Sequence, residues 1–277
     1  LAAIVSSFSL AQGFWGNEFP KGKIKYEPRT YVCHKTTMAV ILDGKITERA
    51  WENVSWTNSF VDIEGDLKPK PYHDTKVKML WDDNYFYFAA LMEEPHVWAT
   101  ITDRDEVIFK DNDFEIFLDP DGDTHNYYEL EVNALETEWD LILLKPYHDD
   151  GKVAVDSWDI PGLITQVHVD GTLNDPIDRD QGWSVEIAIP WKALEECAPY
   201  LHPKEGEQWK VNFSRVQWET DIVDGKYVKT DSPEFNWVWS PQGLIYMHMP
   251  DLWGLVQFTG LAPGKNKVEF KDSELDQ

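Results

Sequence analysis

The sequence predicts an all-β protein, a single antiparallel β-sandwich of the immunoglobulin or jelly-roll kind with one or two short helices. Apolar residues recur with a period of two along several short segments, which is the spacing of strands with one buried face. Turn-forming, often acidic sequences separate these segments, and stretches with helical periodicity are rare. The 277 residues are enough to bury a large core in one β domain.

The clearest expected pair of strands is a hairpin. Residues 76–80 and 85–92 carry apolar side chains in alternation, and residues 81–84, Trp-Asp-Asp-Asn, supply turn formers between them. The same alternation predicts further strands at residues 113–118, 129–134, 183–189, 209–218 and 254–258. Short strands joined by such turns are typical of a sandwich.

Two short helices are expected beside these strands. Residues 46–53 have room for two turns with Thr47 as the N-cap, and residues 190–197 begin with proline, which is favoured at a helix start. No repeat of 20 to 50 residues and no linker divides the chain. Residues 37–262 are therefore expected to form one domain.

The two ends of the chain differ from the sandwich in character. Residues 1–11 are small and apolar without charge, and Ser-Leu-Ala at positions 9–11 fits a small-x-small cleavage site. We interpret them as the end of a secretory signal peptide, the alternative being an apolar first strand. The mature protein is therefore expected to be secreted or periplasmic. Residues 12–36 are expected to form an extension packed on the domain, and residues 263–277 a loose polar tail.

The charge balance excludes several classes of function. The 50 acidic and 25 basic residues give a formal net charge of −25, so the basic surface that nucleic acid requires is missing. An anionic membrane would repel the chain, and no apolar run reaches the ~18 residues of a spanning helix. Disorder is excluded by the 42% of hydrophobic residues and the 14 tryptophans. We expect a monomer with no nucleic-acid or membrane partner.

Polar side chains share one face on several expected strands, because alternate residues of a strand point to the same side. Aromatic rings stack on the apolar faces of a pyranose and polar groups bond its hydroxyls, so such a set predicts a sugar-binding surface. The alternative for each residue is the solvated outer face of a sandwich. Glu129, Glu131 and Asn133 share one face of their strand, and Glu115 lies on the corresponding face of its own. The strand at residues 209–218 carries Arg215 and Gln217 on one side and Asn212, Ser214 and Trp218 on the other.

Two other functions use some of the same or nearby residues. A glycoside hydrolase would employ Glu115 and Glu131 as its acid and base, but such carboxylates must flank the scissile bond, which neighbours on a strand do poorly. A b-type haem domain would need axial Met and His side chains, for which Met247, His248 and Met249 are available, with Met92 and His96 elsewhere.

An acidic loop follows the expected strand at residues 113–118. Asp119, Asp121 and Asp123 cluster oxygen ligands of the kind that calcium prefers, which predicts a structural calcium site. The loop departs from the EF-hand pattern because Gly122 stands at position four, and the alternative is an acidic turn. The pairing of the two cysteines, Cys33 and Cys197, is left open because their distance is unknown.

Five segments in order carry a resemblance to a known family. They are Ile-Leu-Asp-Gly at 41–44 with Ala-Trp at 50–51, then residues 77–87, 112–119 and 182–191, and Trp-Gly at 253–254. Together they resemble family 9 carbohydrate-binding modules, most of all the family 9-like proteins secreted by Bacteroidetes-type bacteria. The resemblance implies an antiparallel β-sandwich that binds sugars without catalysis, often at glycan or polysaccharide ends, in a bacterial carbohydrate-degradation system. It also implies structural calcium.

The chain departs from that family at the sugar site. The best-known members hold a sugar between two tryptophans, which correspond here to Phe109 and to Met247 or His248. The acidic sugar ligand corresponds to Glu115, whereas an arginine of the family corresponds to Glu131. An alternative is a site displaced toward Trp218, Trp237 and Trp239. The residues expected to bind sugar are Phe109, Trp218 and Trp239 by stacking, and Glu115, Glu131, Asn133 and Arg215 by hydrogen bonds.

Overall fold

The computed structural model describes residues 21–149, 151–264 and 268–273. Fifteen strands make up most of its regular structure, and helical residues in the described segments occur only in five short 3-10 turns. The predicted all-β fold is confirmed. The signal peptide expected at residues 1–11 lies outside the described residues.

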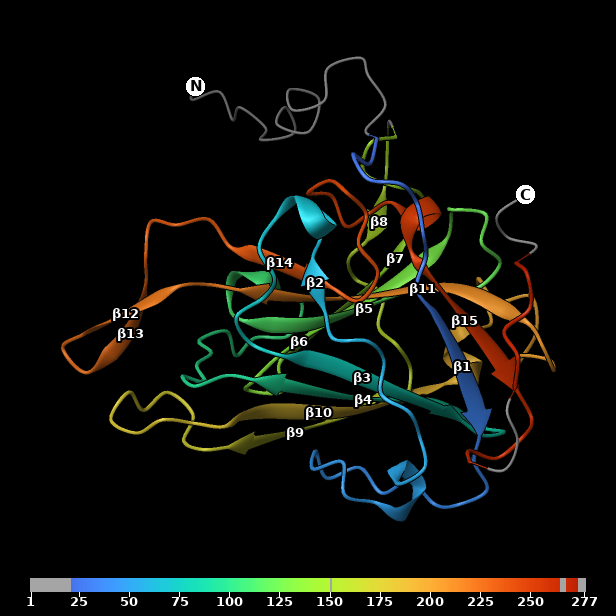
Figure 1. Cartoon of the computed structure of the whole chain (residues 1–277), viewed down its shortest axis with the longest axis horizontal. Helices are drawn as coiled ribbons and strands as arrows, with labels where there is room; N and C mark the ends of the chain where they lie inside the picture. Colours follow the sequence, from blue (N-terminus) through green and yellow to red (C-terminus); the bar gives the residue numbers. More distant parts are fainter. Residues whose placement is uncertain (1–20, 150, 265–267, 274–277) are drawn as a thin grey trace.

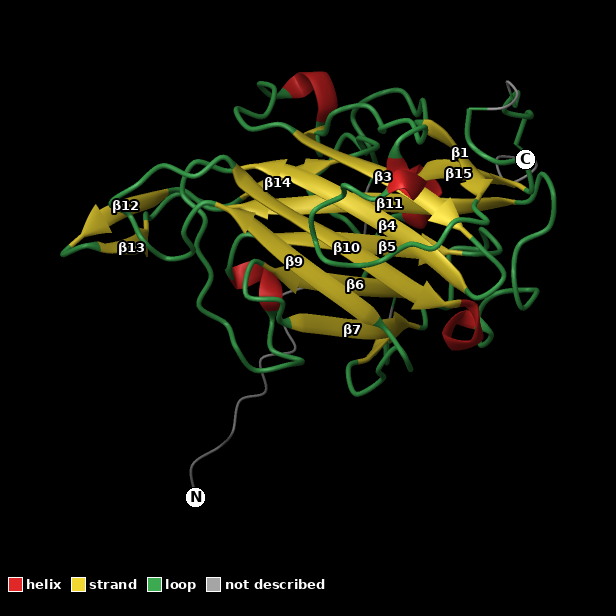
Figure 2. Ribbon diagram, turned by 90° about the horizontal axis from the view of Figure 1, so that it is seen from below, coloured by secondary structure: helices red, strands yellow, loops and turns green. Residues whose placement is uncertain are grey.

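Thirteen strands form one strongly curled sheet whose two halves pack face to face as a sandwich (Figures 1 and 2). One layer consists of β5 (Asp113–Asp119), β6 (Tyr127–Asn133), β7 (Glu138–Leu143), β8 (Ala154–Val155) and β11 (Gln208–Gln217), extended by β14 (Phe235–Val238) and β2 (Val61–Asp62). The other layer consists of β3 (Thr75–Trp81), β4 (Tyr85–Glu93), β10 (Gly182–Pro190) and β9 (Ile164–Asp170). A separate hairpin of β12 (Thr220–Val223) and β13 (Lys226–Lys229) projects from one end (Figure 1).

The two layers are joined through β1 (Thr30–Lys35) and β15 (Gly254–Thr259). β1 pairs in parallel with β15 and, over two residues, with β3, so the sandwich is antiparallel except around this strand. The segment expected as an N-terminal extension thus supplies a strand of the sheet. The described part of the C-terminal tail is bonded as well: Lys271 N–H donates to Gln257 Oε1 at 2.8 Å, and Gln257 Nε2 donates to the Glu269 carbonyl at 3.1 Å.

The core lies between the layers and follows the predicted alternation. On β5, Phe114, Ile116 and Leu118 are buried in it, and on β6 Tyr128, Leu130 and Val132 are. Because a strand directs successive side chains to opposite faces, the acidic residues between them lie on the outer face of this layer.

The helical segments are shorter than expected. The turn within residues 46–53 is η1 (Arg49–Trp51), which Glu48 precedes without a side-chain cap, so Thr47 does not cap a helix. Ile46 stands at a φ of 56°, in the left-handed region, and a helix cannot run through that residue. The second is η4 (Trp191–Leu194), with Pro190 at its N-cap position. Both cysteines are free thiols.

Candidate functional site

A cavity of about 240 Å³ opens on the outer face of the β5–β6–β7 layer. Its acidic residues come from neighbouring strands: Glu115 on β5 pairs in register with Glu131 on β6, and Glu129 lies two residues away on the same face of β6. All three side chains are buried. The full lining is Phe109, Glu115, Phe117, Glu129, Glu131, Trp139, Tyr147, Val216, Glu234, Asn236, Met247 and His248.

Aromatic rings form much of the wall of this cavity. Phe109, in η3 (Ile108–Lys110), is 39% exposed, and Tyr147 is 38% exposed, so both offer ring surface to a ligand. Trp139 pairs in register with Glu131, and its buried Nε1 has no hydrogen-bond partner among the described residues. The Phe109 backbone is fixed to the acidic floor because its N–H donates to Glu131 Oε2 at 3.0 Å. Rings and carboxylates therefore converge on one space.

Charge is poorly compensated in this cavity. Burial raises the pKa of Glu115 to about 7, although the Ser214 hydroxyl donates to it. Burial, and then the neighbouring carboxylates, raise the pKa values of Glu131 and Glu129 well above the usual range. Burial lowers the pKa of His248 to about 3, so this imidazole is neutral and adds no positive charge. Among the described lining residues none is Lys or Arg.

Four expected sugar ligands, Asn133, Arg215, Trp218 and Trp239, do not line this cavity. Asn133 is completely buried: its Nδ2 donates to the Ile101 carbonyl at 2.9 Å, and its Oδ1 accepts the N–H groups of Leu135 and Thr137. The amide therefore holds the turn after β6 and is not available to a ligand. The assignment of Asn133 to sugar binding is corrected accordingly.

Arg215 and Trp239 lie on the inner side of the layer. Arg215 is 0% exposed, and its Nη2 donates to Glu94 Oε2 at 2.8 Å while its Nη1 donates to Thr75 Oγ1 at 2.9 Å. Trp239 is 0% exposed within the core and lies against Phe213. A ring or a guanidinium without exposed surface cannot contact a sugar, so both assignments are wrong. Trp237, the other tryptophan of the displaced-site alternative, is buried in the same core.

Trp218 takes an intermediate place at the edge of the site. It is half-buried, and its Nε1 donates to the Phe109 carbonyl at 2.9 Å, so it supports the segment that carries Phe109. The Lys229 ammonium lies 4.0 Å from the centre of its ring. Trp218 is not among the residues that line the cavity. Trp218 therefore supports the segment of Phe109, and its stacking on a sugar stays a prediction.

Several lining residues escaped the sequence analysis. Trp139 lies opposite Glu131 on the adjacent strand, and its period-two spacing with Leu141 and Leu143 was an available signal. Tyr147, Glu234 and Asn236 come from distant parts of the chain, and only the fold brings them together.

The acidic loop after β5 gathers oxygens as predicted. Asp119, Asp121 and Asp123 each offer a carboxylate oxygen within 4.8 Å of the others. Asp119 is buried, and its oxygens accept the N–H groups of Gly122 and Thr124 at 3.0 Å. Burial is the main cause that raises the pKa of Asp119 to about 7. This donor set fits a hard cation, which accepts clustered carboxylate oxygens, and the turn bonds also hold the loop by themselves.

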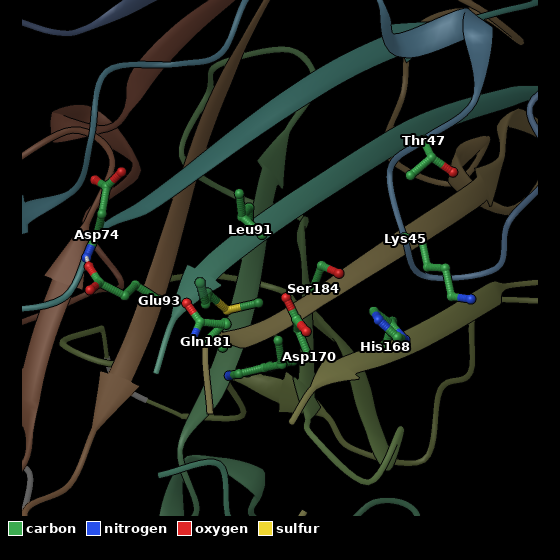
Figure 3. Close-up of a pocket in the computed structure, with 12 residues that line it drawn as sticks. Lys45, Thr47, Asp74, Leu91, Glu93, His168, Asp170, Gln181 and Ser184 are labelled. Atoms are coloured by element: carbon green, nitrogen blue, oxygen red, sulfur yellow. Dashed lines mark hydrogen bonds between the residues drawn. The ribbon is translucent and has the colours of Figure 1, made fainter. Parts of the chain in front are cut away.

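A larger depression, of about 510 Å³, lies on the outer face of the other layer (Figure 3). Asp74 and Glu93 stand at one end of it, and Lys45 and His168 at the other. Its one tryptophan, Trp183, is 2% exposed, so the described lining presents no open aromatic ring. The smaller cavity is the better candidate because it combines exposed rings with convergent polar groups.

The arrangement of the acidic floor bears on the hydrolase alternative. Glu115 and Glu131 project side by side from one sheet face, whereas a glycosidase needs carboxylates on either side of the scissile bond. Two carboxylates on one sheet face are suited to accepting hydrogen bonds from hydroxyl groups on one side of a sugar.

The expected haem ligands are scattered. Met92 is in the core, and His96 Nδ1 lies 3.1 Å from the Tyr227 hydroxyl, away from His248. Met247 and His248 are adjacent on one wall and cannot take the two faces of a macrocycle. Nothing in this placement favours haem.

The fold and the cavity define a β-sandwich protein with an acidic, ring-lined cavity on the outer face of one sheet. The model of the family described as carbohydrate family 9 binding domain-like matches residues 41–238, and the chain belongs to this family. Comparison with curated proteins gives no match. In the described residues, no helix has the length and apolar character needed to cross a membrane.

Solved structures share the fold at low sequence identity. A family 9 carbohydrate-binding module from Caldicellulosiruptor kristjanssonii in complex with cellotriose is 17% identical with a TM-score of 0.54, covering 87% of this chain and 99% of that one. The same organism's module in complex with glucose is 18% identical with a TM-score of 0.53, covering 85% and 100%. A candidate carbohydrate-binding protein from Bacteroides uniformis ATCC 8492 is 16% identical with a TM-score of 0.57, covering 84% and 100%.

Proposed function

We propose that this protein binds carbohydrate without cleaving it, and that the cavity on the outer face of the β5–β6–β7 layer receives the sugar. The single observation that carries the proposal is the convergence of Phe109 and Tyr147 rings with Glu115 and Glu131 in one space of about 240 Å³. Rings supply stacking surface for a pyranose and carboxylates accept its hydroxyl hydrogens. Family membership and structural neighbours that hold cellotriose and glucose support the same reading.

A second cavity extends the proposed site along the sheet. It measures about 410 Å³ and shares Glu234 and Asn236 with the first. Tyr72, which is 52% exposed, stands on its wall. An oligosaccharide end bound in the first cavity would continue into the second, which suits recognition of glycan or polysaccharide ends.

The remaining parts of the proposal concern the setting of the protein. We place it as a monomer in a secreted or periplasmic carbohydrate-degradation system, on the strength of the apolar segment at residues 1–11 and the net charge of −25. Calcium at Asp119, Asp121 and Asp123 would be structural, because the loop lies next to β5 and its ligands would fix the end of that strand.

Titration calorimetry with glucose, cellotriose and a glycan panel tests the proposal. Phe109→Ala is expected to weaken binding by about 1–3 kcal/mol, because an exposed ring in a site carries much of the contact energy. Leu91→Ala, in the larger depression, is the matched control because Leu91 is also exposed, and it is expected to leave affinity unchanged. Melting curves of both variants are measured alongside and are expected to match that of the wild type. Absence of affinity for every glycan, or loss of affinity in Leu91→Ala alone, would reject the proposed site.

A further inference from the structure

The acidic floor of the cavity is exceptional in how little it is neutralised. Elsewhere the chain supplies donors to its buried carboxylates. Glu186 receives Trp51 Nε1 at 2.8 Å and the N–H groups of Gly44 and Asp43, and Asp180 receives the N–H groups of Val97 and Thr172. Such donors replace the water that a carboxylate loses on burial.

Three buried carboxylates form the floor, and a fourth lies next to them without lining the cavity; the four receive few hydrogen bonds. Asp113 Oδ1 accepts the Val216 N–H at 3.1 Å, Glu131 accepts the Phe109 N–H, and Glu115 accepts the Ser214 hydroxyl. Glu129 Oε1 lies 4.0 Å from the neutral His248. The four carboxylates are Asp113, Glu115, Glu129 and Glu131.

One atom of this group is left without any partner. Asp113 is completely buried, and its Oδ2 has no hydrogen-bond partner among the described residues. Asp113, Glu115 and Glu131 each place an oxygen within 4.8 Å of the others. A buried oxygen without a donor is destabilising, and Asp113 itself does not line the cavity, so the group is stabilised when positive charge enters the cavity beside Glu115 and Glu131.

We infer that the cavity recognises a sugar with a protonated amine, a glucosamine-type unit, whose ammonium lies against Glu115, Glu129 and Glu131 while its ring stacks on Phe109. This inference rests on the proposed function and names the ligand class of the same site. An ammonium donates three hydrogen bonds and brings the missing charge. Binding favours the ionised carboxylates, whose pKa values burial now holds high.

The walls favour an organic cation over a metal ion. A cavity of about 240 Å³ is far larger than an ion, and rings rather than further oxygens line much of it. Calcium takes six to eight oxygen ligands, whereas an ammonium is also attracted by aromatic faces such as those of Trp139 and Tyr147. A metal at Asp113, Glu115 and Glu131 is therefore the competing occupant that the experiment must detect.

The test compares three monosaccharides that differ only at one carbon: glucosamine, N-acetylglucosamine and glucose. Calorimetry with the full chain is expected to show glucosamine binding at least about tenfold more tightly than the other two, since both lack the charge. The preference should vanish at a pH where the amine is neutral. Glu131→Gln should abolish it, because the amide can still accept the Phe109 N–H but carries no charge. Glu93→Gln, an exposed glutamate in the larger depression, is the control and should retain it.

Each alternative result has a distinct meaning. Equal affinity for the three sugars, or a preference that survives in Glu131→Gln, overturns this inference and leaves the proposed function standing. Calcium alone, titrated without sugar, would overturn it if the ion bound in a way that Glu131→Gln removes. No binding of any sugar, including the glycan panel, overturns both. Thermal melting confirms that each variant is folded before its affinity is compared.

Discussion

The two faces of β11 treat buried charge in opposite ways. On the inner face Arg215 neutralises Glu94, which is 3% exposed, and Asn112 Nδ2 adds a further bond to that carboxylate. On the outer face Ser214 meets Glu115, whose neighbours Glu129 and Glu131 are acidic as well. One strand thus separates a closed ion pair from an open acidic floor.

This difference distinguishes buried carboxylates that stabilise the fold from buried carboxylates that can bind a ligand. The inner pair, Arg215 and Glu94, finds its partners within the chain, and its hydrogen bonds join β11 to the end of β4 and the residue after it. The outer carboxylates Glu115, Glu129 and Glu131 line a cavity with no Lys or Arg among its described residues, and such groups are available to a ligand. Burial alone does not separate the two cases; the supply of donors does.

Removing the inner cation should produce the largest effect. Arg215→Met leaves Glu94 buried without its charge partner, which is expected to lower the free energy of unfolding by about 3–5 kcal/mol in urea denaturation. Sugar affinity at a temperature where the variant is folded should not change, because Arg215 faces away from the cavity. The double variant Arg215→Met with Glu94→Gln should recover part of the loss. A stable Arg215→Met with weakened sugar binding would reverse the assignment of the two faces.

Removing one outer carboxylate should change the free energy of unfolding in the opposite direction and by a smaller amount. Glu131→Gln is expected to raise the free energy of unfolding by about 1–3 kcal/mol at pH 8, since it removes a carboxyl whose ionised form burial disfavours in the folded chain.

The pH dependence fixes the sign of this effect. Burial and then the neighbouring carboxylates raise the pKa of Glu131 well above its usual value of 4.5, so Glu131 is protonated in folded and unfolded chains well below pH 4.5 and costs nothing there. Above pH 4.5 the unfolded chain loses this proton first, so the folded chain binds more protons and stability falls as pH rises. Wild type and Glu131→Gln should converge below pH 4.5 and diverge above it. Glu93→Gln, measured alongside, should track wild type; a constant offset at all pH values would contradict the electrostatic explanation.

The acidic loop after β5 is a third case. Backbone N–H groups donate to its buried carboxylate, Asp119, and by our proposal calcium binds the same loop. Free calcium at ten times its dissociation constant would stabilise the fold by about 1.4 kcal/mol, and a chelator should remove that gain as a lower melting temperature. Asp121→Asn with Asp123→Asn should remove the response to chelator, while Glu131→Gln should keep it. A melting temperature indifferent to chelator at low ionic strength would leave only the turn bonds of Asp119 to hold this loop.

Alternation along single strands predicted much of the fold and the acidic face, because every second residue of β5 and β6 belongs to the hydrophobic core. It did not predict that the acidic residues between them are buried as well. The same rule already contained the correction for Arg215, which shares its parity with Val211 and Phe213 of the core. Asn133 and Trp239 were misassigned because residue type does not reveal whether partners within the chain consume a side chain. The wall residue Tyr147 could not be predicted, since alternation says nothing about contacts between distant loops.

The smallest expected effect concerns Lys229, whose ammonium covers the Trp218 ring at 4.0 Å and donates to the Lys110 carbonyl at 2.7 Å. Lys229→Met should lower the free energy of unfolding by about 0.5–1 kcal/mol, the usual worth of an exposed cation–π contact. Affinity for a single sugar should stay the same, because Lys229 and Trp218 lie outside the cavity lining and Lys229 does not neutralise its carboxylates. Lys226→Met on the same hairpin strand is the control for a change of net charge. If Lys229→Met raised sugar affinity and Lys226→Met did not, the uncovered Trp218 ring would belong to the binding surface. The sugar-binding surface would then extend beyond Phe109 to Trp218.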